Sequence, residues 1–406
     1  MMLPRIGRRW YGTLQTEGMM MPACLTVPTR RHLLGAGISI AFLPVVAGAG
    51  KRPLRISLLG QSLIKTDLRA TGWKGLAEFR RVLKGRDVVF TDLETVIAGP
   101  LAGKSTRPAG SEVLHVGDPS VIDCLQAIGV NIVATSNNHA WDLDTGGILS
   151  TIDALRTRQL AFAGTGSDLA AASAPGFLRG RGTVALVAAA AGAIREGAAA
   201  TGSRPGVNEL RRAADGALLP LDVERYLAAI RLAAAGGATV IAYLHSHYWE
   251  PRKSDTPGWQ RELARQAIDV GAATFVAHGV PELQGIEYYR GAPLFHGLSS
   301  FIFQSEKADD AYGPEAWQSA IAELDIIDDV VETRLIPVQL DAGGLHHEGR
   351  RVRGSPRLAT GSSVDEVVER LSRLSMALGS SVRFETAKQR RQGVTSVGIS
   401  PNLPPS

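Results

Sequence analysis

Short apolar segments alternate with amphipathic helical segments from Leu54 onward, and this alternation constrains the fold more than any other feature of the sequence. The apolar segments are brief and often bounded by Gly, Pro or Asp, which is typical of buried strands. We expect strands in LRISLLG, DVVFTDLE, VNIVATS, TVALVAAA, TVIAYLHS, ATFVAHG and APLFHGL. Helices are expected in DTGGILSTIDALRTRQ and LDVERYLAAIRLAAAGG, whose apolar residues recur at helical spacing. This order predicts an α/β fold class.

The distribution of charge argues against a nucleic-acid partner. The chain carries a formal net charge of +5, but residues 1–49 hold five Arg and one Glu, so four of the five net charges lie there. The remainder lacks the basic stripe that a surface tracking a phosphate backbone needs. We therefore expect no nucleic acid among the partners.

The segment TRRHLLGAGISIAFLPVVAGAG, starting at Thr29, joins paired arginines to an apolar stretch and a small-residue end. It resembles a twin-arginine export signal, with AGA at 47–49 as a cleavage site. We expect an exported protein, periplasmic or membrane-associated through an uncleaved signal; a buried N-terminal helix is the alternative. Cleavage would leave Cys124 as the one cysteine, and its helical apolar neighbours predict a core position.

Polar clusters stand where several of the expected strands end. These clusters are TDLE, SNNH, LHSH and AHG. Ligand crevices of α/β folds lie at the carboxyl ends of strands, and imidazole, amide oxygen and carboxylate are ligands of divalent metals. The clusters therefore predict a metal site. In SNNHAWD (136–142), Asp142 is expected to cap the following helix, since carboxylates favour helix N-termini.

Several blocks of the sequence, from about Leu54 to Gln304, resemble the poly-gamma-glutamate capsule-synthesis (CapA) family. The principal blocks are SNNHAWDLDTGGILSTIDALRTRQLAFAGTG and AIDVGAATFVAHGVPELQGIEYYRGAPLFHGLSSFIFQ. The resemblance implies a layered α-β-β-α sandwich related to the calcineurin-like metallophosphoesterases, with a small C-terminal strand–helix extension. It predicts an export signal region (1–50), a CapA-like domain (52–305), an extension packed on that domain (306–395) and a flexible tail (396–406).

The same resemblance implies roles for individual residues. Asn138 would be a metal ligand, and His139 would protonate a leaving oxygen, because imidazole changes its charge near neutral pH. The other residues expected at the site are Asp92, Glu94, His245, His247 and His278 as metal ligands, and Asn137, Gln61 and Glu282 as substrate contacts.

Departures from the family pattern bear on the metal count. Gln61 stands where the family has Asp, Pro281 stands where it has its last His, and Ser300 replaces Asn. A neutral amide is a poor bridge between two cations, so one metal ion (Mn, Fe, Zn or Mg), or none, remain the open cases.

Three functions follow as alternatives. The first is an exported protein of capsule or poly-gamma-glutamate biosynthesis or export, with an anionic polymer and a capsule-synthesis membrane complex as partners. The second is a periplasmic metal-dependent phosphoesterase or related hydrolase acting on a phosphorylated substrate. The third is a degenerate polymer-binding module that keeps the cleft without catalysis.

Overall fold

The computed structural model describes residues 52–103, 114–249, 251–307, 309–328, 330–380, 382–385, 389–391 and 394–401. All of them belong to one compact unit, residues 51–406. The export signal expected in residues 1–50 lies outside the described residues. Among the described helices, none combines the length and apolar character needed to cross a bilayer.

The larger of two main sheets has ten strands, and four neighbouring ones run parallel. These parallel strands are β1 (Leu54–Leu58), β3 (Val88–Asp92), β6 (Ile132–Ala134) and β7 (Ala161–Ala163). Antiparallel strands extend the sheet beyond β1, in the order β17 (Gln318–Ile327), β18 (Val330–Leu340), β24 (Val394–Pro401) and β22 (Val382–Phe384). Two short strands attach to these: β21 (Pro356–Leu358) and β23 (Gln389–Arg391).

The second sheet has six strands. Its parallel centre consists of β10 (Thr183–Ala191), β12 (Thr239–Ser246), β13 (Ala272–His278) and β15 (Ala292–Phe295). The edges are antiparallel: β9 (Gly176–Arg179) and β14 (Ile286–Tyr289).

One face of each main sheet contributes to a shared apolar core. In β3, Phe90 points into this core together with Tyr243 of β12, and their ring centroids lie 5.3 Å apart. Val89 points to the opposite face of its sheet, into a second core. This alternation follows from the two-residue period of a strand. Strand β3 is therefore buried on both faces.

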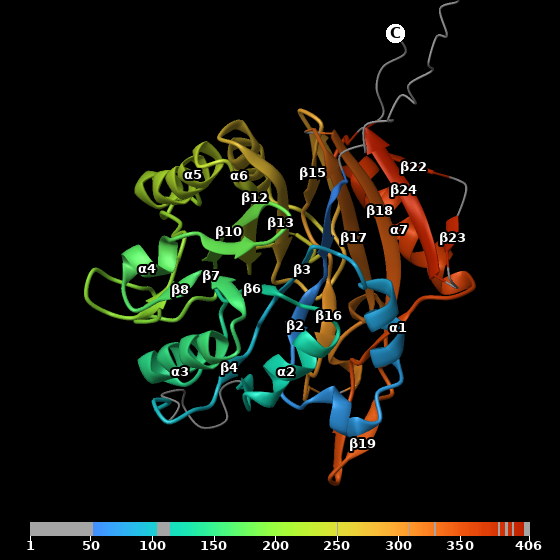
Figure 1. Cartoon of the computed structure of the whole chain (residues 1–406), viewed down its shortest axis with the longest axis horizontal. Coiled ribbons are helices and arrows are strands. Elements are labelled where there is room, and N and C mark those ends of the chain that lie inside the picture. Colours follow the sequence, from blue (N-terminus) through green and yellow to red (C-terminus); the bar gives the residue numbers. More distant parts are fainter. Residues whose placement is uncertain are drawn as a thin grey trace, which may run out of the picture. The chain divides into compact units, whose positions relative to one another are not determined.

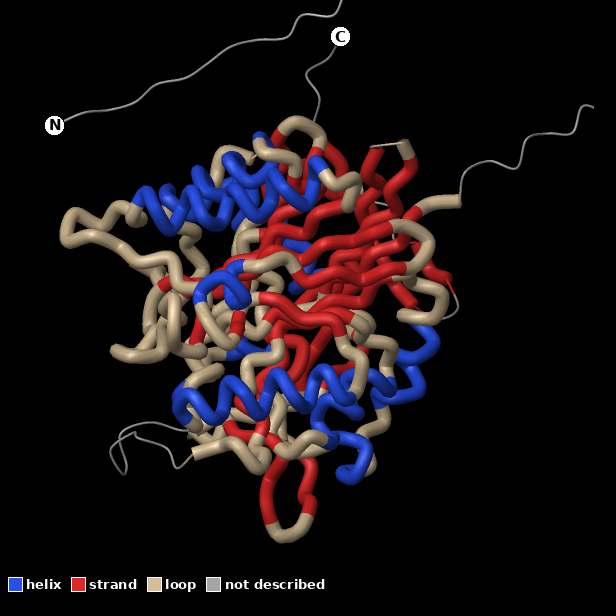
Figure 2. The backbone as a smooth tube through the Cα atoms, turned by 60° about the vertical axis from the view of Figure 1, so that its left-hand side comes forward, coloured by secondary structure: helices blue, strands red, loops and turns tan. Residues whose placement is uncertain are grey.

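Helices pack against the outer faces. The helices α5 (Pro220–Ala235) and α6 (Gly258–Asp269) share a core with the outer face of β10, β12 and β13 (Figure 1). The helices α1 (Gly75–Val82) and α2 (Ser120–Ala127) do the same for the larger sheet, and Cys124 is buried there, as predicted. Figure 2 shows the strands between these two sets of helices.

The remaining helices close the sides of the structure. The helix α7 (Ser362–Ala377) adds three apolar residues to the core between the sheets, and α3 (Asp144–Thr157) packs beside β4, β7 and β8. The shorter elements are α4 (Leu169–Ser173), the 3-10 turns η1 (Leu68–Thr71), η2 (Asp309–Ala311) and η3 (Pro314–Trp317), and the paired strands β2 (Gln61–Leu63) with β16 (Ser300–Phe303), β4 (Val96–Ile97) with β5 (Val116–Gly117), β8 (Thr165–Gly166) with β11 (Gly206–Val207), and β19 (Leu345–His347) with β20 (Arg350–Val352).

The mixed α/β class agrees with the prediction, and two details of the C-terminal part differ from it. Residues 394–401 form β24, which pairs with β18, so the flexible tail expected from residue 396 is wrong as far as residue 401. Val397 and Ile399 of this strand are buried, and that burial holds it in place. Strand β17, in the expected extension, pairs directly with β1.

Candidate functional site

Strands from both main sheets end at the candidate site. Glu94 follows the end of β3, and SNNHAWD follows β6. His245 lies near the end of β12, and His247 comes directly after it. The carboxyl ends of parallel strands collect side chains at one edge of a sheet. Residues that are far apart in the sequence therefore meet here.

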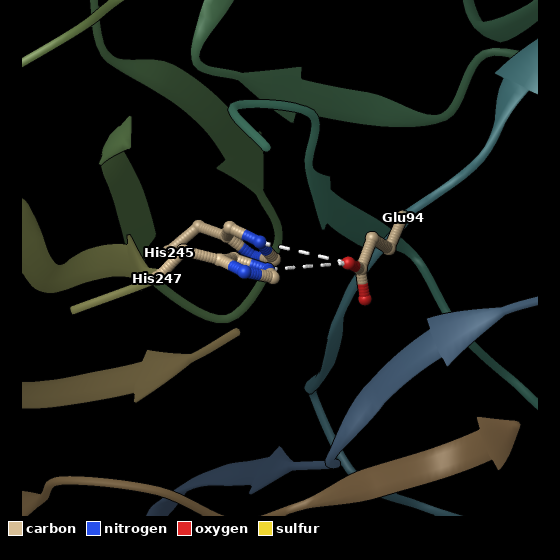
Figure 3. Close-up of side chains that lie close together, drawn as sticks. All are labelled: Glu94, His245 and His247. Atoms are coloured by element: carbon tan, nitrogen blue, oxygen red, sulfur yellow. Dashed lines mark ion pairs between the residues drawn. The ribbon is translucent and has the colours of Figure 1, made fainter. Parts of the chain in front are cut away.

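Glu94, His245 and His247 form a cluster of metal-type ligands (Figure 3), and one ligand atom from each lies within 4.8 Å of the other two. Glu94 Oε1 is 3.6 Å from His245 Nε2 and 3.9 Å from His247 Nε2. Ligand bonds of about 2.0–2.2 Å to one ion place ligand atoms roughly 3–4 Å apart. The cluster therefore has dimensions that suit a single divalent ion.

The ring of His245 is fixed from both sides. Its Nδ1 lies 3.0 Å from Asp92 Oδ2, and its Nε2 lies 2.9 Å from Asn138 Oδ1. Both oxygens are acceptors, so a neutral ring that donates from Nδ1 to Asp92 turns a lone pair toward the Asn138 oxygen. A metal ion bound by both atoms would relieve this contact. Asn138 thus joins the candidate ligands, while Asp92 orients His245 from behind.

Two atoms of the cluster lack hydrogen bonds. Within the described part of the chain, Glu94 Oε2 and His247 Nε2 are buried and have no hydrogen-bond partner. Burial raises the pKa of Glu94 to about 7, against the opposing influence of His245 and His139. Burial also lowers the pKa of His247 to about 3, so its ring is neutral at neutral pH and keeps an electron pair for a ligand bond. These residues fit a divalent cation, which would complete the bonding of both atoms.

Gln61 and His278 do not extend this cluster. Gln61 Oε1 accepts a hydrogen bond of 2.6 Å from the Gly279 amide, and its Nε2 donates to Ser300 Oγ at 3.4 Å. The ring of His278 stacks on Phe90 with an interplanar angle of 8°, and burial lowers its pKa to about 3. Gln61 therefore joins β13 to β16 through its amide, and the described residues gather one candidate ion position.

His139 is held by a buried carboxylate. Its Nδ1 donates to Asp142 Oδ2 at 2.8 Å, and the same oxygen accepts the backbone N–H of His115 at 2.8 Å. This arrangement occupies Nδ1 of His139 and leaves its Nε2 to exchange a proton. The expectation that Asp142 caps a helix is wrong, because α3 begins at Asp144 and its N-cap is Leu143.

Asn137 and Glu282, both expected to contact substrate, lie off the cavity wall. The side chain of Asn137 is fully used: its Nδ2 donates to Asp92 Oδ1 at 3.1 Å and to the Leu93 carbonyl at 2.8 Å, and its Oδ1 accepts from the His139 amide. Asn137 thereby connects the Asp92 and His139 segments. Glu282 is half-buried, and burial raises its pKa.

A cavity of about 540 Å³ opens in front of these groups. One part of its lining consists of residues predicted from the sequence: Glu94, Asn138, His139, His247 and Gln61. The rest comes from residues that the search for polar clusters at strand ends did not identify, chiefly His115, Arg195, Trp249, Lys253, Lys307 and Tyr312. The ammonium groups of Lys253 and Lys307 each lie 5.8 Å from the centre of the Tyr312 ring. The only sequence signal was HSHYWEPRK, which places Trp249 and Lys253 just after His247. We call this space the site cavity; Arg195, Lys253 and Lys307 form its basic wall.

Comparison with known proteins identifies related chains. The model of a family described as bacterial capsule synthesis protein PGA_cap matches residues 55–305. An uncharacterized protein of Sinorhizobium fredii is 26% identical over 421 residues, covering 80% of this chain and 90% of the relative. The PGA biosynthesis protein CapA of Bacillus subtilis is 25% identical over 232 residues, covering 54% and 58% of the two chains. A probable polyglutamine synthesis accessory protein of Mycobacterium tuberculosis is 28% identical over 245 residues, covering 59% and 60%. The resemblance seen in the sequence is confirmed.

Proposed function

The chain belongs to the bacterial capsule synthesis protein PGA_cap family, and from this premise we propose that it acts on an anionic capsule polymer of the poly-gamma-glutamate type in the site cavity. One observation carries the proposal. The Glu94–His245–His247 cluster, the His139–Asp142 pair and the basic wall all face or adjoin this single cavity. The two sheets with their shared core and outer helices support a metallophosphoesterase-like sandwich as the framework.

The basic wall gives the cavity a preference for anions. Three cationic side chains, Arg195, Lys253 and Lys307, line it together with one acidic residue, Glu94, whose pKa is raised by burial. A cavity whose lining charges are mostly of one sign concentrates ions of the opposite sign. The aromatic rings of Trp249 and Tyr312 offer apolar contact between the charges. A polymer that alternates carboxylates with methylene groups matches this combination.

Glu94, Asn138, His245 and His247 would hold a divalent ion, which would supply Lewis-acid activation of a bound group. The chain's own residues supply the remainder. Asp92 keeps the Nδ1 proton on His245, which leaves its Nε2 free for a ligand bond. Asp142 keeps the Nδ1 proton on His139, so Nε2 can accept a proton from water and return it to the leaving atom. The basic wall holds the anionic groups on either side of the bond.

The test combines metal analysis with polymer binding on the full chain. We expect stoichiometric Mn, Fe, Zn or Mg, and loss of that metal in Glu94→Ala. The His139→Ala variant should keep both metal and polymer binding but lose bond cleavage by about 10²–10⁴-fold, because His139 moves protons without contacting the ion. An unchanged metal content in Glu94→Ala, or absence of polymer binding by the native protein, would overturn the proposal.

A polymer-binding module without catalysis is the second candidate. The engagement of Gln61 with Gly279 and Ser300 favours it, since that amide is unavailable to a second ion. Metal-free protein that binds poly-gamma-glutamate with undiminished affinity and cleaves neither the polymer nor a simple phosphodiester would select this candidate over a hydrolase.

We also propose that the chain is exported through its N-terminal segment. The support is the pairing of Arg30 and Arg31 with an apolar stretch. Replacing both arginines by lysine should leave the protein in the cytoplasmic fraction. Equal distribution of the variant and the native protein between fractions would contradict export by this route.

A further inference from the structure

A second cavity, of about 420 Å³, lies at the other end of the larger sheet. The site cavity adjoins the carboxyl ends of β3 and β6, whereas this one adjoins the start of β1 and the segment that leads into β3. We call it the basic cavity. Its lining residues are Arg55, Arg81, Val82, Lys84, Arg86, Glu323, Asp325, Arg334, Ile336, Val394 and Ser396.

Two of its five cations already neutralise its two acids. The carboxylate of Asp325 forms ion pairs with the guanidinium of Arg86 at 2.8 Å and with that of Arg334 at 2.7 Å. Glu323 lies 3.9 Å from Arg86 and 3.7 Å from Arg334. Burial opposes ionisation of Asp325, but these guanidinium groups outweigh it and hold its pKa below the ordinary value. These four residues therefore form a closed ionic group.

Three cations remain without an acidic partner among the described residues: Arg55 from β1, Arg81 from α1 and Lys84 from the turn after α1. The Nε of Arg55 is buried and has no hydrogen-bond acceptor in the described part of the chain. A buried donor without a partner is costly, and three like charges around one space repel one another. An anion in the basic cavity removes both penalties.

We propose that the basic cavity binds a compact, multiply charged phosphate group. Guanidinium groups bind phosphate oxygens through paired N–H donors, and a lysine adds a point charge. Two surplus guanidiniums and one ammonium, contributed by three segments of the chain, meet these requirements. The phosphate has two possible sources, a soluble phosphate compound or the headgroup of an anionic lipid. This site is separate from the site cavity and does not depend on the function proposed for it.

Calorimetric titration of the full chain with inorganic phosphate tests the proposal. Titration in a Lys253→Ala/Lys307→Ala background reduces the contribution of the site cavity, where Arg195 is then the one remaining cation of the basic wall. We expect saturable binding that weakens with salt, and at least a tenfold loss of affinity in Arg81→Ala/Lys84→Ala, because two charge-assisted contacts disappear. Both residues are exposed, so the fold should survive. Arg80→Ala is the matched control, an exposed arginine beside Arg81 that does not line the cavity.

No saturable phosphate binding at millimolar concentration would overturn the proposal, as would equal losses in the double variant and the control. Vesicles identify the source. Sedimentation with phosphatidic acid but not phosphatidylcholine vesicles, lost in Arg81→Ala/Lys84→Ala, assigns the phosphate to a lipid. Phosphate binding without sedimentation assigns it to a soluble compound.

Discussion

Replacing Asp92 by asparagine should weaken metal binding although Asp92 is outside the ligand cluster. Asp92 is fully buried, and its Oδ2 receives the Nδ1 proton of His245 at 3.0 Å. The amide of the variant would lack the charge that holds this proton, and its NH₂ group facing Nδ1 would favour the tautomer that carries its proton on Nε2. A metal ion must then displace that proton before it can bind. Loss of such a supporting carboxylate costs about 10–100-fold in metal affinity.

Competition with a chromophoric chelator measures this affinity, and thermal unfolding gives an independent readout. At a metal concentration of about 100 times the native dissociation constant, the native protein gains about 2.7 kcal/mol, while a variant with 100-fold weaker binding gains about 0.4 kcal/mol. Asp142→Asn is the control, since Asp142 is equally buried but pairs with His139. Native affinity in Asp92→Asn, or an equal loss in the control, would refute the reasoning.

Three further predictions concern stability. Phe79→Ala should lower the unfolding free energy in urea by about 3–5 kcal/mol, because Phe79 is fully buried between Trp73 and Phe301; a loss under about 1 kcal/mol would contradict this packing. Burial raises the pKa of Glu287, but hydrogen bonds from His296 and Arg261 outweigh it and depress that pKa. The difference in unfolding free energy between the native protein and Glu287→Gln should therefore be largest above about pH 4.3 and shrink at lower pH. A difference independent of pH would be inconsistent with this reasoning. Gly279→Ala should lower the unfolding free energy by an amount on the order of 1–3 kcal/mol, measured by thermal unfolding, because φ is +115° and the new Cβ would lie 2.1 Å from the Ser246 carbonyl oxygen. Gly180→Ala is the control, since a Cβ there meets open space, and equal effects of the two substitutions would contradict the prediction.

The strands of the parallel centre could be read from the sequence because their burial on both faces leaves continuous apolar segments. TVIAYLHS, for example, coincides with β12 (Thr239–Ser246). The same property located the ligand cluster, since His245 and Glu94 stand at or just after the ends of such strands. Strand β17 was missed because polar residues such as Glu323 and Asp325 interrupt its apolar pattern. Its pairing with β18 and β1 becomes visible only in three dimensions.

The role of Asp142 shows where local rules fail. A carboxylate close to the start of an expected helix suggests an N-terminal cap, and sequence alone gives no reason to prefer another partner. The structure brings the backbone of His115, 27 positions earlier, to the same carboxylate oxygen that receives His139. The basic wall was not predicted from the sequence, for a related reason. Arg195, Lys253 and Lys307 come from three separate loops, and only the packing of the two sheets brings those loops around one space.

The position of β1 within its sheet has a consequence for how the chain acquires its fold. This first strand of the unit pairs on one side with β3, the next strand of the same sheet along the chain, and on the other with β17, where Leu54 lies opposite Ile326. A nascent chain leaving the ribosome therefore exposes one edge of β1 until β17 (Gln318–Ile327) has been synthesised. Closing so long a loop is slow, and an open apolar edge invites aggregation in the meantime. Closure of this edge therefore has to wait for β17, and the yield of folded protein should depend on chaperones that shield the edge.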